Sequence, residues 1–391
     1  MKKNIWMSAP GLICCAGRNR NELYDSCLNG YQGGMAMAEL PGTGEKFPVG
    51  LIPGELPEAA FPPEAYAGGN RIIRIIDAAL EQMRPDMEKA IAKYGPEKIG
   101  VCLGSCDNGS EASLKAHQAL FAEGAFPEDY RLRFQSAAFP AEFIARKFGL
   151  SGPVFTIATA CASGASAVIR GAELIRAGLC EAVIAGGADI VSPTVLAGFH
   201  ALEAVSDSLT NPFSKNRKGI NLGEGAAFFI LDSAENSAVE LLGAGESADA
   251  CHMTAPDTDG TGAAKAMKTA LADAGLEPGD IGYINLHGTG TELNDRAEAL
   301  AMKAVFGEAP PISSTKPITG HTLGAAGALE AAICWMVLAE RRGLPVHCWD
   351  GVRDEEIPVF PGGAGQKTPG KCMSNSFAFG GCNVSLILGK K

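Results

Sequence analysis

One thiol lies in the sequence VFTIATACASGASAVIRGAELIRAG, residues 154–178, at the point where the apolar pattern changes. Residues 154–159 have the pattern of a buried strand, and apolar residues recur at helical spacing from Ser163 onward. We therefore expect Cys161 at a helix N-terminus, where free N–H groups and the helix dipole stabilise a thiolate and lower the pKa of the thiol. The same N–H groups could form half of an oxyanion hole. The alternative is an ordinary packed cysteine.

A histidine and two threonines follow a second predicted strand, in the sequence INLHGTGTELND. His287 ends that strand in a glycine-rich loop, where an imidazole is poised for chemistry; a hydrogen-bonded structural histidine is the alternative. Thr289 and Thr291 offer hydroxyl groups that could hold a polar arm of a substrate. Asn294 and Asp295 have the positions of plain caps of the next helix.

Three ionisable residues lie within the sequence SSTKPITGHTLGAAGALEAA. His321 precedes the start of a helix rich in glycine and alanine, and Glu330 lies well inside that helix. Lys316 beside a histidine would keep the imidazole neutral and stabilise developing negative charge. Glu330 would orient Lys316 or join a buried polar network. Each residue also has an ordinary alternative: a surface lysine, a capping histidine and a glutamate on a helix face.

One cysteine at a strand–helix turn and two histidines in later loops suit the chemistry of acyl thioesters. The thiolate attacks a thioester and gives a covalent acyl-enzyme. Two neutral imidazoles can then donate hydrogen bonds to the carbonyl of a second substrate, which stabilises the enolate formed when a carboxylate leaves as carbon dioxide. A cysteine protease would instead need one histidine oriented by an asparagine or aspartate.

These loops need a large α/β scaffold to bring them together. With 391 residues and 49 glycines in short loops, the chain is long enough for two domains, or for one domain of two similar halves. We divide it into residues 1–235, which carry the thiol, and residues 236–391, which carry the two histidines. Reactive residues follow strands in both halves, where open α/β sheets bind ligands. Residues 71–94 are predicted as one helix, and residues 40–69 as an ordered excursion rich in proline and glycine.

The composition excludes several classes of protein. A net charge of −11 argues against nucleic-acid binding, which needs a basic surface. No apolar run is expected to approach the roughly 20 residues of a membrane helix. The start, MKKNIWMSAPGLICCAG, is interrupted by polar residues, proline and glycine, which favours a first strand over a signal peptide. The twelve cysteines have no disulfide-scaffold spacing and no CxxC pair, which predicts a reduced, cytoplasmic protein.

Four motifs, TACASG, HGTGT, TKPITGHTLGAAG and NSFAFGGCN, occur in this order and resemble those of the elongating (decarboxylative condensing) β-ketoacyl-acyl carrier protein synthases. The resemblance covers essentially the whole chain. It implies the α/β thiolase fold, with two similar βαβαβαββ halves in a five-layer α/β/α/β/α sandwich, usually as a homodimer. It also implies the reaction. An acyl chain moves to Cys161, malonyl-carrier protein loses carbon dioxide, and the enolate attacks the acyl-enzyme to give a 3-oxoacyl-carrier protein.

The resemblance assigns a role to each candidate residue. Cys161 is the acyl-accepting nucleophile, and His287 and His321 complete a Cys-His-His triad. Lys316 and Glu330 match the supporting charged pair. Two threonines, Thr289 and Thr291, hold the phosphopantetheine arm, and the N–H of the gate phenylalanine Phe379 completes the oxyanion hole. Three further residues are expected to bind the substrate: Phe377, Phe199 and Asp107.

The resemblance also implies partners. Acyl- and malonyl-carrier protein bring the phosphopantetheine, so no cofactor and no metal ion are predicted, although some family members hold a monovalent cation near positions matching Asn285, Glu330 and Asn375. The carrier protein is usually acidic, as this chain is, so a local basic patch must overcome a net repulsion. Four arginines lie in regions that match the docking face of the family, each with an ordinary solvated arginine as its alternative: Arg71, Arg74, Arg131 and Arg133.

Some residues depart from the family pattern. Asp107 falls where fatty-acid-elongating members carry an apolar residue of the acyl pocket, and a carboxylate there is costly unless it is paired or solvated. This puts a long saturated acyl substrate in doubt. Ala378 replaces a glycine beside the gate, and Cys382 replaces a threonine. The sequence around Lys316 and the later LPVHCWDG are similar to ketosynthases of bacterial aryl polyene pathways, which extend conjugated chains.

Three alternatives stay open. A housekeeping fatty-acid synthase is the main rival. A degradative thiolase shares the fold but needs a second catalytic cysteine in a different motif, and Cys382 lies in the synthase gate motif instead. A non-catalytic protein like a chain-length factor would usually lack the nucleophile, which this chain keeps. The chain could still work only beside such a partner, as a heterodimer.

Overall fold

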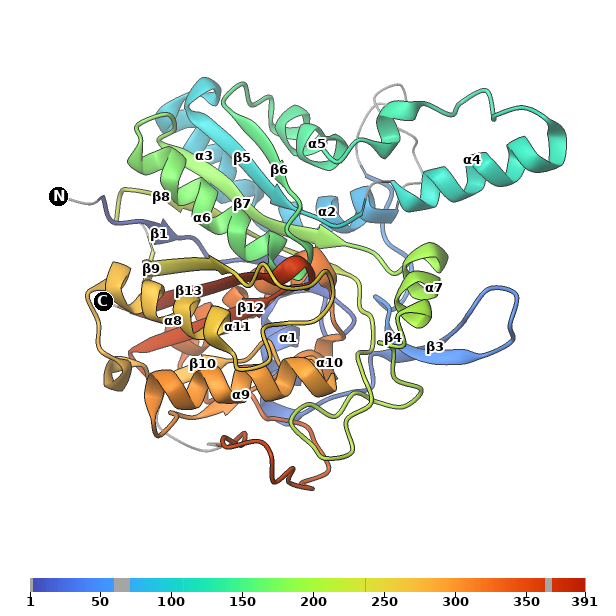
Figure 1. Ribbon diagram of the computed structural model, residues 1–391. Helices are drawn as coiled ribbons and strands as arrows, with labels where there is room; N and C mark the ends of the chain where they lie inside the picture. Colours follow the sequence, from blue (N-terminus) through green and yellow to red (C-terminus); the bar gives the residue numbers. More distant parts are fainter. Residues whose placement is uncertain (1–2, 60–70, 108, 236, 363–367, 391) are drawn as a thin grey trace.

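The computed structural model describes residues 3–59, 71–107, 109–235, 237–362 and 368–390. The predicted excursion over residues 40–69 is therefore described only as far as residue 59, and residue 236 of the predicted division lies outside the described residues. The elements from β1 to β8 build the first half of the molecule, and those from β9 to β13 build the second (Figure 1).

The helices and strands of the first half are β1 (Trp6–Met7), β2 (Gly11–Cys14), α1 (Arg20–Asn29), β3 (Met35–Glu39), β4 (Lys46–Gly50), α2 (Arg71–Glu81), α3 (Arg84–Tyr94), β5 (Ile99–Gly104), α4 (Ser110–Glu123), α5 (Phe139–Phe148), β6 (Val154–Ile157), α6 (Ser163–Arg176), β7 (Ala182–Asp189), α7 (Pro193–Ala201) and β8 (Gly225–Asp232). Those of the second half are β9 (Val239–Ala248), α8 (Thr261–Ala274), β10 (Tyr283–Asn285), α9 (Glu292–Phe306), β11 (Ile312–Ser313), α10 (Lys316–Thr319), α11 (Ala326–Glu340), β12 (Lys371–Phe377) and β13 (Cys382–Lys390).

Both halves have the same strand order. In the first half the strands lie in the order β6-β5-β7-β8-β1, and in the second in the order β11-β10-β12-β13-β9. In each half the first three of these strands run parallel, and the remaining pairings are antiparallel. Strand β1 also pairs with β9 and joins the two halves into one 11-stranded sheet. The topology thus contains a repeat that is not visible residue by residue.

Three separate apolar cores produce the layers. One core packs α2, α3 and α5 against the outer face of β5, β7 and β8. The central core packs α6 and α11 between strands of both halves, and a third packs α8 and α9 against β10, β12 and β13. Helices therefore alternate with sheet in five layers, as the ribbon shows (Figure 1). The predicted thiolase fold is confirmed.

The two central helices approach closely because small residues line their contact. A Cβ atom added to Gly327 of α11 would lie 2.8 Å from the Cβ atom of Ala165 in α6. The stretch Leu323–Glu340, which includes α11, is long and apolar enough to cross a membrane by length and composition, and 89% of it is buried inside the protein. The expectation that no apolar run approaches this length is wrong for this stretch, which forms the core helix of the sandwich.

Other local expectations have mixed outcomes. The N-terminal residues form strands β1 and β2 of the sheet, as predicted, and all twelve cysteines are free. The helix predicted over residues 71–94 is wrong in one respect, because it is divided into α2 and α3. Pro85 lies in the first turn of α3 and has no N–H group to continue a helix. Residues 35–50 form the hairpin β3–β4.

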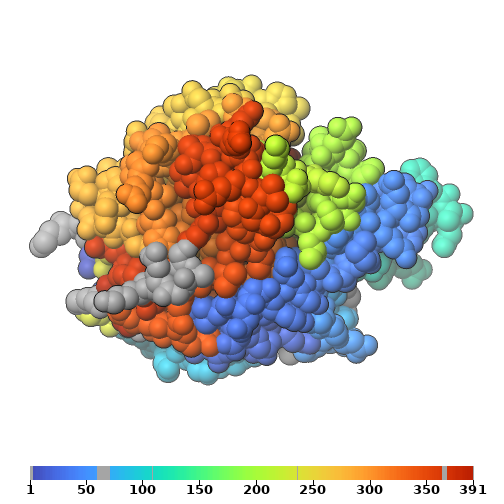
Figure 2. Space-filling model, turned by 90° about the horizontal axis from the view of Figure 1, so that it is seen from below, coloured from blue at the N-terminus to red at the C-terminus, as the bar shows by residue number. Residues whose placement is uncertain are grey.

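Distant parts of the chain meet on one face of the molecule. Figure 2 shows the blue N-terminal segment against the orange-red segment of the second half. The N–H of Val346 donates to the carbonyl of Cys27 at 2.9 Å, and the amide of Gln32 donates to the carbonyl of Pro317 at 3.2 Å. These contacts attach the region of α1 to the segment that carries Lys316.

Candidate active site

Cys161 lies at a strained turn between β6 and α6. Ala160 before it has a φ of 48°, in the left-handed region that residues with a side chain rarely adopt. The hydroxyl of Ser163 holds this turn, because it donates to the carbonyl of Ala160 at 2.6 Å and accepts from the N–H of Thr159 at 2.9 Å. The thiol therefore stands just before the first turn of α6, which is the position predicted from the sequence.

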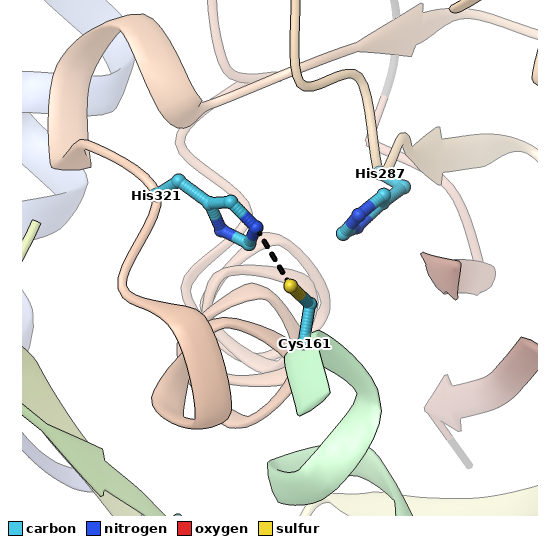
Figure 3. Close-up of side chains that lie close together, drawn as sticks. All are labelled: Cys161, His287 and His321. Atoms are coloured by element: carbon cyan, nitrogen blue, oxygen red, sulfur yellow. Dashed lines mark hydrogen bonds between the residues drawn. The ribbon is translucent and has the colours of Figure 1, made fainter. Parts of the chain in front are cut away.

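The structure brings the three predicted triad residues together (Figure 3). His321 Nε2 lies 3.0 Å from Cys161 Sγ, and the rings of His287 and His321 are 5.4 Å apart at an angle of 82°. All three side chains are buried, and their ligand-type atoms lie within 4.8 Å of one another. Such a group of donors could hold a metal ion; the expectation that it holds none stays a prediction.

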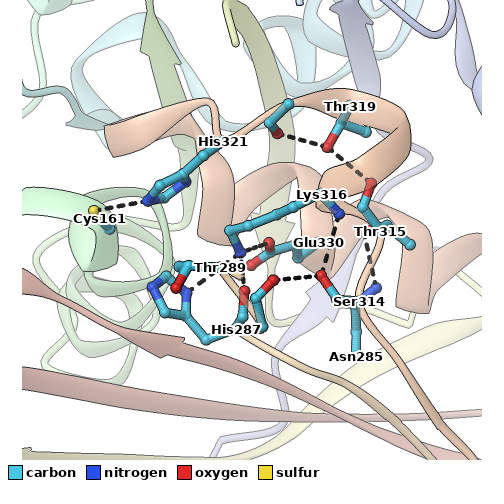
Figure 4. Close-up of polar contacts among 12 residues, drawn as sticks. Cys161, Asn285, His287, Thr289, Ser314, Thr315, Lys316, Thr319, His321 and Glu330 are labelled. Carbon is cyan, nitrogen blue, oxygen red and sulfur yellow. Dashed lines mark hydrogen bonds and ion pairs between the residues drawn. The ribbon is translucent and has the colours of Figure 1, made fainter. Parts of the chain in front are cut away.

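Lys316 fixes the tautomer of His287 (Figure 4). Its ammonium group lies 3.4 Å from His287 Nδ1, and it also donates to the carbonyl of His287 and to Glu330 Oε1. Because an ammonium group can only donate, Nδ1 of His287 accepts and Nε2 carries the proton. The Nε2–H group of His287 is therefore available to donate to a substrate, while Glu330 compensates the buried charge of Lys316.

Burial decides the protonation states of the site. It raises the pKa of the Cys161 thiol to about 12, against the opposing effects of Lys316 and of the Phe379 N–H. The predicted lowering of this pKa is therefore wrong, because burial of the thiol outweighs the effect of the helix N-terminus. Burial, and next the charge of Lys316, lowers the pKa of His287 and of His321 well below its usual value. Both imidazoles are neutral, as predicted.

A carboxylate that the sequence analysis missed holds the loop of His287. Glu298 of α9 is fully buried and accepts hydrogen bonds from the N–H of His287 at 2.9 Å and the N–H of Gly288 at 2.8 Å. Burial raises its pKa to about 7, although these two N–H groups oppose the rise. Its only sequence signal is its place in the helix that directly follows the loop.

A cavity of about 250 Å³ leads to the triad, whose three residues form part of its wall. Phe377 and Phe379 line it from the gate segment, and Phe199 lines it from α7. Phe199 stacks on Phe379, with ring centroids 5.9 Å apart and an angle of 26° between the rings. Phe377 lies beside His287, with ring centroids 6.2 Å apart. The three predicted aromatic residues thus share one cavity with the triad.

Polar groups of the same cavity suit a thioester on a polar arm. The hydroxyl oxygens of Thr289 and Thr291 are 2.9 Å apart on the cavity wall. The N–H of Phe379 faces the sulfur of Cys161, where an oxyanion hole needs a donor. Glu203 and Glu292 also line the cavity, and the sequence analysis did not single them out.

Asp107 is not among the residues that line this cavity. Its carboxylate accepts from the N–H of Gly109 at 2.9 Å, from the N–H of Ser110 at 3.2 Å and from the Ser110 hydroxyl. It therefore caps the start of α4, and these donors supply the pairing that a buried carboxylate needs. The role of Asp107 in substrate binding stays a prediction.

The four predicted docking arginines have different surroundings. The guanidinium of Arg71 binds the fully buried carboxylate of Glu224, with Nε 2.7 Å from Oε2. Arg71 therefore belongs to an ion pair with a buried partner and is not an ordinary solvated arginine, whereas its docking role stays a prediction. The docking role of the other three stays a prediction too. Each has neighbouring partners: Arg74 with Glu58, Arg133 with Glu142, and Arg131 with the carbonyls of Glu128 and Tyr130.

Two family models match the chain. The N-terminal domain of the β-ketoacyl synthases matches residues 61–237, and their C-terminal domain matches residues 238–347. The chain belongs to the β-ketoacyl synthase family. This confirms the resemblance drawn from the four motifs and makes the chain a condensing acyltransferase. The division at residues 235 and 236 stays a prediction.

Curated relatives cover most of the chain. A 3-oxoacyl-[acyl-carrier-protein] synthase 2 of Vibrio cholerae is 36% identical over 79% of this chain and 80% of the relative. Nodulation protein E of Rhizobium meliloti is 32% identical over 99% of both.

Solved structures extend the similarity to the whole fold. The ketosynthase ApeO of Xenorhabdus doucetiae, solved in complex with its chain length factor ApeC, matches with 40% identity and a TM-score of 0.93, over 100% of this chain and 98% of that chain. The ishigamide ketosynthase/chain length factor matches with 29% identity and a TM-score of 0.90 over 100% of both chains.

Proposed function

We propose that this chain is the cysteine-bearing subunit of a β-ketoacyl-carrier protein synthase that extends conjugated acyl chains by two carbons. The observation that carries this proposal is the complete Cys-His-His set in a chain 40% identical to a ketosynthase solved with its chain length factor. A chain-length-factor-like protein is then the partner, and acyl- and malonyl-carrier protein are the substrates. The proposed compartment is the cytoplasm, and no cofactor beyond the phosphopantetheine of the carrier is needed.

The first step transfers the acyl group. The thiol proton of Cys161 passes to Nε2 of His321, 3.0 Å away, as Sγ bonds to the thioester carbon. The N–H groups of Cys161 and Phe379 hold the oxyanion. When the tetrahedral intermediate collapses, the C–S bond to the carrier arm breaks, and the departing thiolate takes the proton back from His321. The high pKa of the resting thiol keeps Cys161 protonated until a substrate arrives.

The second step forms the carbon–carbon bond. The malonyl thioester breaks its bond to the carboxylate, which leaves as carbon dioxide, and the enolate oxygen accepts the Nε2–H of His287. The acylated sulfur has no proton to share, so His321 can carry its proton on Nε2 and donate as well. The enolate carbon bonds to the acyl carbonyl, the C–S bond to Cys161 breaks, and the released thiolate takes a proton from water.

An exposed apolar surface supports a partner subunit. Phe155 on β6 and Leu179 after α6 are 50% and 58% exposed, and they line a groove of about 360 Å³. On the arm formed by α4 and the following residues, Phe121 is 86% exposed and Leu132 is 73% exposed. Apolar surface of this kind marks protein interfaces. A homodimer would cover the same surface and is the alternative to the heterodimer.

Intact mass spectrometry tests the proposal. The chain, alone and co-expressed with a chain-length-factor-like protein, is incubated with carrier protein that bears either a conjugated or a saturated acyl group of equal length. We expect an acyl adduct on the wild type and none on Cys161→Ala. Malonyl-carrier protein should then discharge the adduct as a 3-oxoacyl product, faster for the conjugated chain. No adduct with either donor, with or without the partner, would contradict the catalytic role.

A housekeeping fatty-acid synthase is the second candidate, favoured by the identity to the 3-oxoacyl-[acyl-carrier-protein] synthase 2 sequences. The same experiment separates the two. Discharge of the saturated adduct at an equal or higher rate, without a partner, would support fatty-acid elongation and contradict the specialised substrate.

A further inference from the structure

A buried carboxylate outside the triad joins the two halves of the molecule. Asp189 ends β7 and is 1% exposed. Its Oδ1 accepts from the hydroxyl of Ser105 at 2.8 Å and from the N–H groups of Cys106 and Asp107 at 3.0 and 2.9 Å. Its Oδ2 accepts from the N–H of Gly324, in the second half, at 2.5 Å. The condensing steps above make no use of this group.

The contact with Gly324 leads directly to the active site. Gly324 lies in the turn η6 (Leu323–Ala325), which follows His321. Leu323 has a φ of 49°, so this turn also contains a residue in the left-handed region. A strained turn of this kind persists only where its surroundings hold it. The carboxylate of Asp189 provides such a hold.

Backbone segments meet around this contact without room for side chains. A Cβ atom on Gly324 would lie 2.6 Å from Asp189 Oδ2, and one on Gly187 would lie 2.6 Å from the carbonyl oxygen of Gly324. A Cβ atom on Gly164, in the first turn of α6, would lie 2.8 Å from that same oxygen. The turn η6 is therefore packed directly against the helix that begins beside Cys161.

The ring of His321 depends on this backbone for its position. Within the described part of the chain, its Nδ1 is buried and has no hydrogen-bond partner. The backbone of His321 is held by its N–H, which donates to the carbonyl of Asn221 at 2.7 Å, and by its carbonyl, which accepts from the N–H of Gly223 at 2.9 Å. The ring of His287, in contrast, is also held at its Nδ1 by Lys316. The turn η6 begins two residues after His321, so the contact of Asp189 with Gly324 holds the backbone on the C-terminal side of the imidazole that contacts the thiol.

We infer that Asp189 is a positioning residue of the condensing reaction, which holds the turn η6 and so keeps His321 within hydrogen-bonding distance of Cys161. It acts through Gly324 and does not touch the substrate. This inference rests on the proposed condensing function.

The charge of Asp189 also acts on the nucleophile. Burial raises the pKa of the Cys161 thiol most, and the charges around it then act in both directions: Lys316 lowers this pKa, and Asp189 and Glu330 raise it. Burial raises the pKa of Asp189 itself to about 7, where the nearby Asp107 adds to the rise and the hydrogen-bond donors oppose it. Removal of this carboxylate should therefore release His321 and lower the pKa of Cys161 together.

The variant Asp189→Asn tests the inference, with Asp232→Asn as its matched control. Asp232 is also a buried aspartate at the end of a strand, β8, and its carboxylate binds the hydroxyl of Tyr94 rather than the active site. The rate of alkylation of Cys161 by iodoacetamide is measured across a pH series by peptide mass mapping, in a background where the exposed Cys251 is replaced by serine. The kcat and KM of condensation are measured on the same proteins.

In Asp189→Asn, we expect the alkylation profile to shift to lower pH and kcat to fall about tenfold, because an amide cannot accept from all the buried donors. The KM for the carrier substrates should stay unchanged, and Asp232→Asn should behave as the wild type in both measurements. A lowered Tm together with an unchanged profile and an unchanged kcat would show that Asp189 acts only in folding, which would overturn the inference.

A milder variant covers the case in which Asp189→Asn does not fold. Ser105→Ala removes one donor that lowers the pKa of Asp189, so kcat should fall in the same direction by about twofold. An unchanged kcat there would count against the inference.

Alkylation needs no carrier protein. A wild type that condenses no carrier substrate would overturn the proposed function, and the alkylation profiles alone would then decide whether Asp189 acts on Cys161.

Discussion

At the scale of single residues, Lys316 has two separable roles. Its ammonium compensates Glu330, and it makes Nδ1 of His287 an acceptor. The change Lys316→Met leaves a buried carboxylate without a partner, which should lower the free energy of unfolding by roughly 3–5 kcal/mol. We expect acyl transfer to Cys161 to persist and decarboxylation to fall roughly a hundredfold, because without Lys316 nothing keeps the proton of His287 on Nε2, where it can donate to the enolate. Intact mass and the release of carbon dioxide from malonyl-carrier protein measure the two steps.

The double variant Lys316→Met/Glu330→Gln separates the two roles. Both buried charges are gone, so the stability should largely return, whereas decarboxylation should stay low because nothing fixes the tautomer of His287. A double variant that recovers decarboxylation along with stability would contradict the tautomer argument.

Glu330 should make stability depend on pH. Burial raises its pKa from 4.5 to about 7. In this interval the folded chain keeps a proton that the unfolded chain releases, so this contribution to stability is full below the unfolded pKa and is lost as the pH rises through the folded pKa. The amide in the variant Glu330→Gln cannot titrate. As the pH rises, the unfolding free energy of the variant should therefore fall less steeply than that of the wild type, with slopes that differ by up to about 1.4 kcal/mol per pH unit. Denaturant titrations across this interval give both slopes, and parallel slopes would refute the assignment.

The sequence contained enough to find some of these residues but not all. Cys161, His287 and His321 were predicted because each follows a strand in a loop of small residues. Glu298 and Asp189 were missed because they bind backbone N–H groups, which leave no pattern of residue types. The pKa of Cys161 was predicted in the wrong direction because a helix N-terminus is visible in a sequence, whereas burial by the other half of the molecule is not.

At the scale of elements, the contact between α6 and α11 depends on glycine. A Cβ atom on Gly327 would lie 2.7 Å from Ser376 Oγ and 2.8 Å from the Cβ atom of Ala165. We expect Gly327→Ala to lower the free energy of unfolding by about 1–3 kcal/mol, since the helices must move apart. Gly198→Ala is the control in α7, where no atom lies within 4 Å of the added Cβ.

The control should be neutral or more stable by about 0.5–1 kcal/mol, because alanine suits a helix better than glycine does. Denaturant unfolding of both variants measures the difference. Equal effects at the two positions would show that close helix packing does not explain Gly327.

The elements themselves were predicted better than their pairing. Strand–loop–helix units were visible in both halves because apolar periodicity is a local property. The common strand order and the β1–β9 contact were not visible, since they join residues that are distant in the chain, as Trp6 and Glu240 are. Four motifs identified the fold only through their resemblance to a known family, not through the physics of strand pairing.

At the scale of the whole molecule, the outermost strand of the first half has a free edge in the described chain. Strand β6 ends the strand order, and its Phe155 is half exposed. A bare sheet edge beside an apolar groove is a site where another chain can pair. The arm of α4 lies apart from the body of the molecule (Figure 1), so the surface offered to a partner extends beyond the sheet.

Phe155→Lys should therefore prevent subunit association, because it buries a charge in the interface without a partner. Met37→Lys is the matched control: Met37 is 58% exposed on the hairpin strand β3, which belongs to the separate two-stranded sheet. Sedimentation velocity of each variant, alone and with the chain-length-factor-like protein, measures association. We expect Phe155→Lys to sediment as a monomer that still folds, and Met37→Lys to sediment as the wild type does. If Phe155→Lys still associates, the interface does not include β6, and the partner covers a different surface from the one expected.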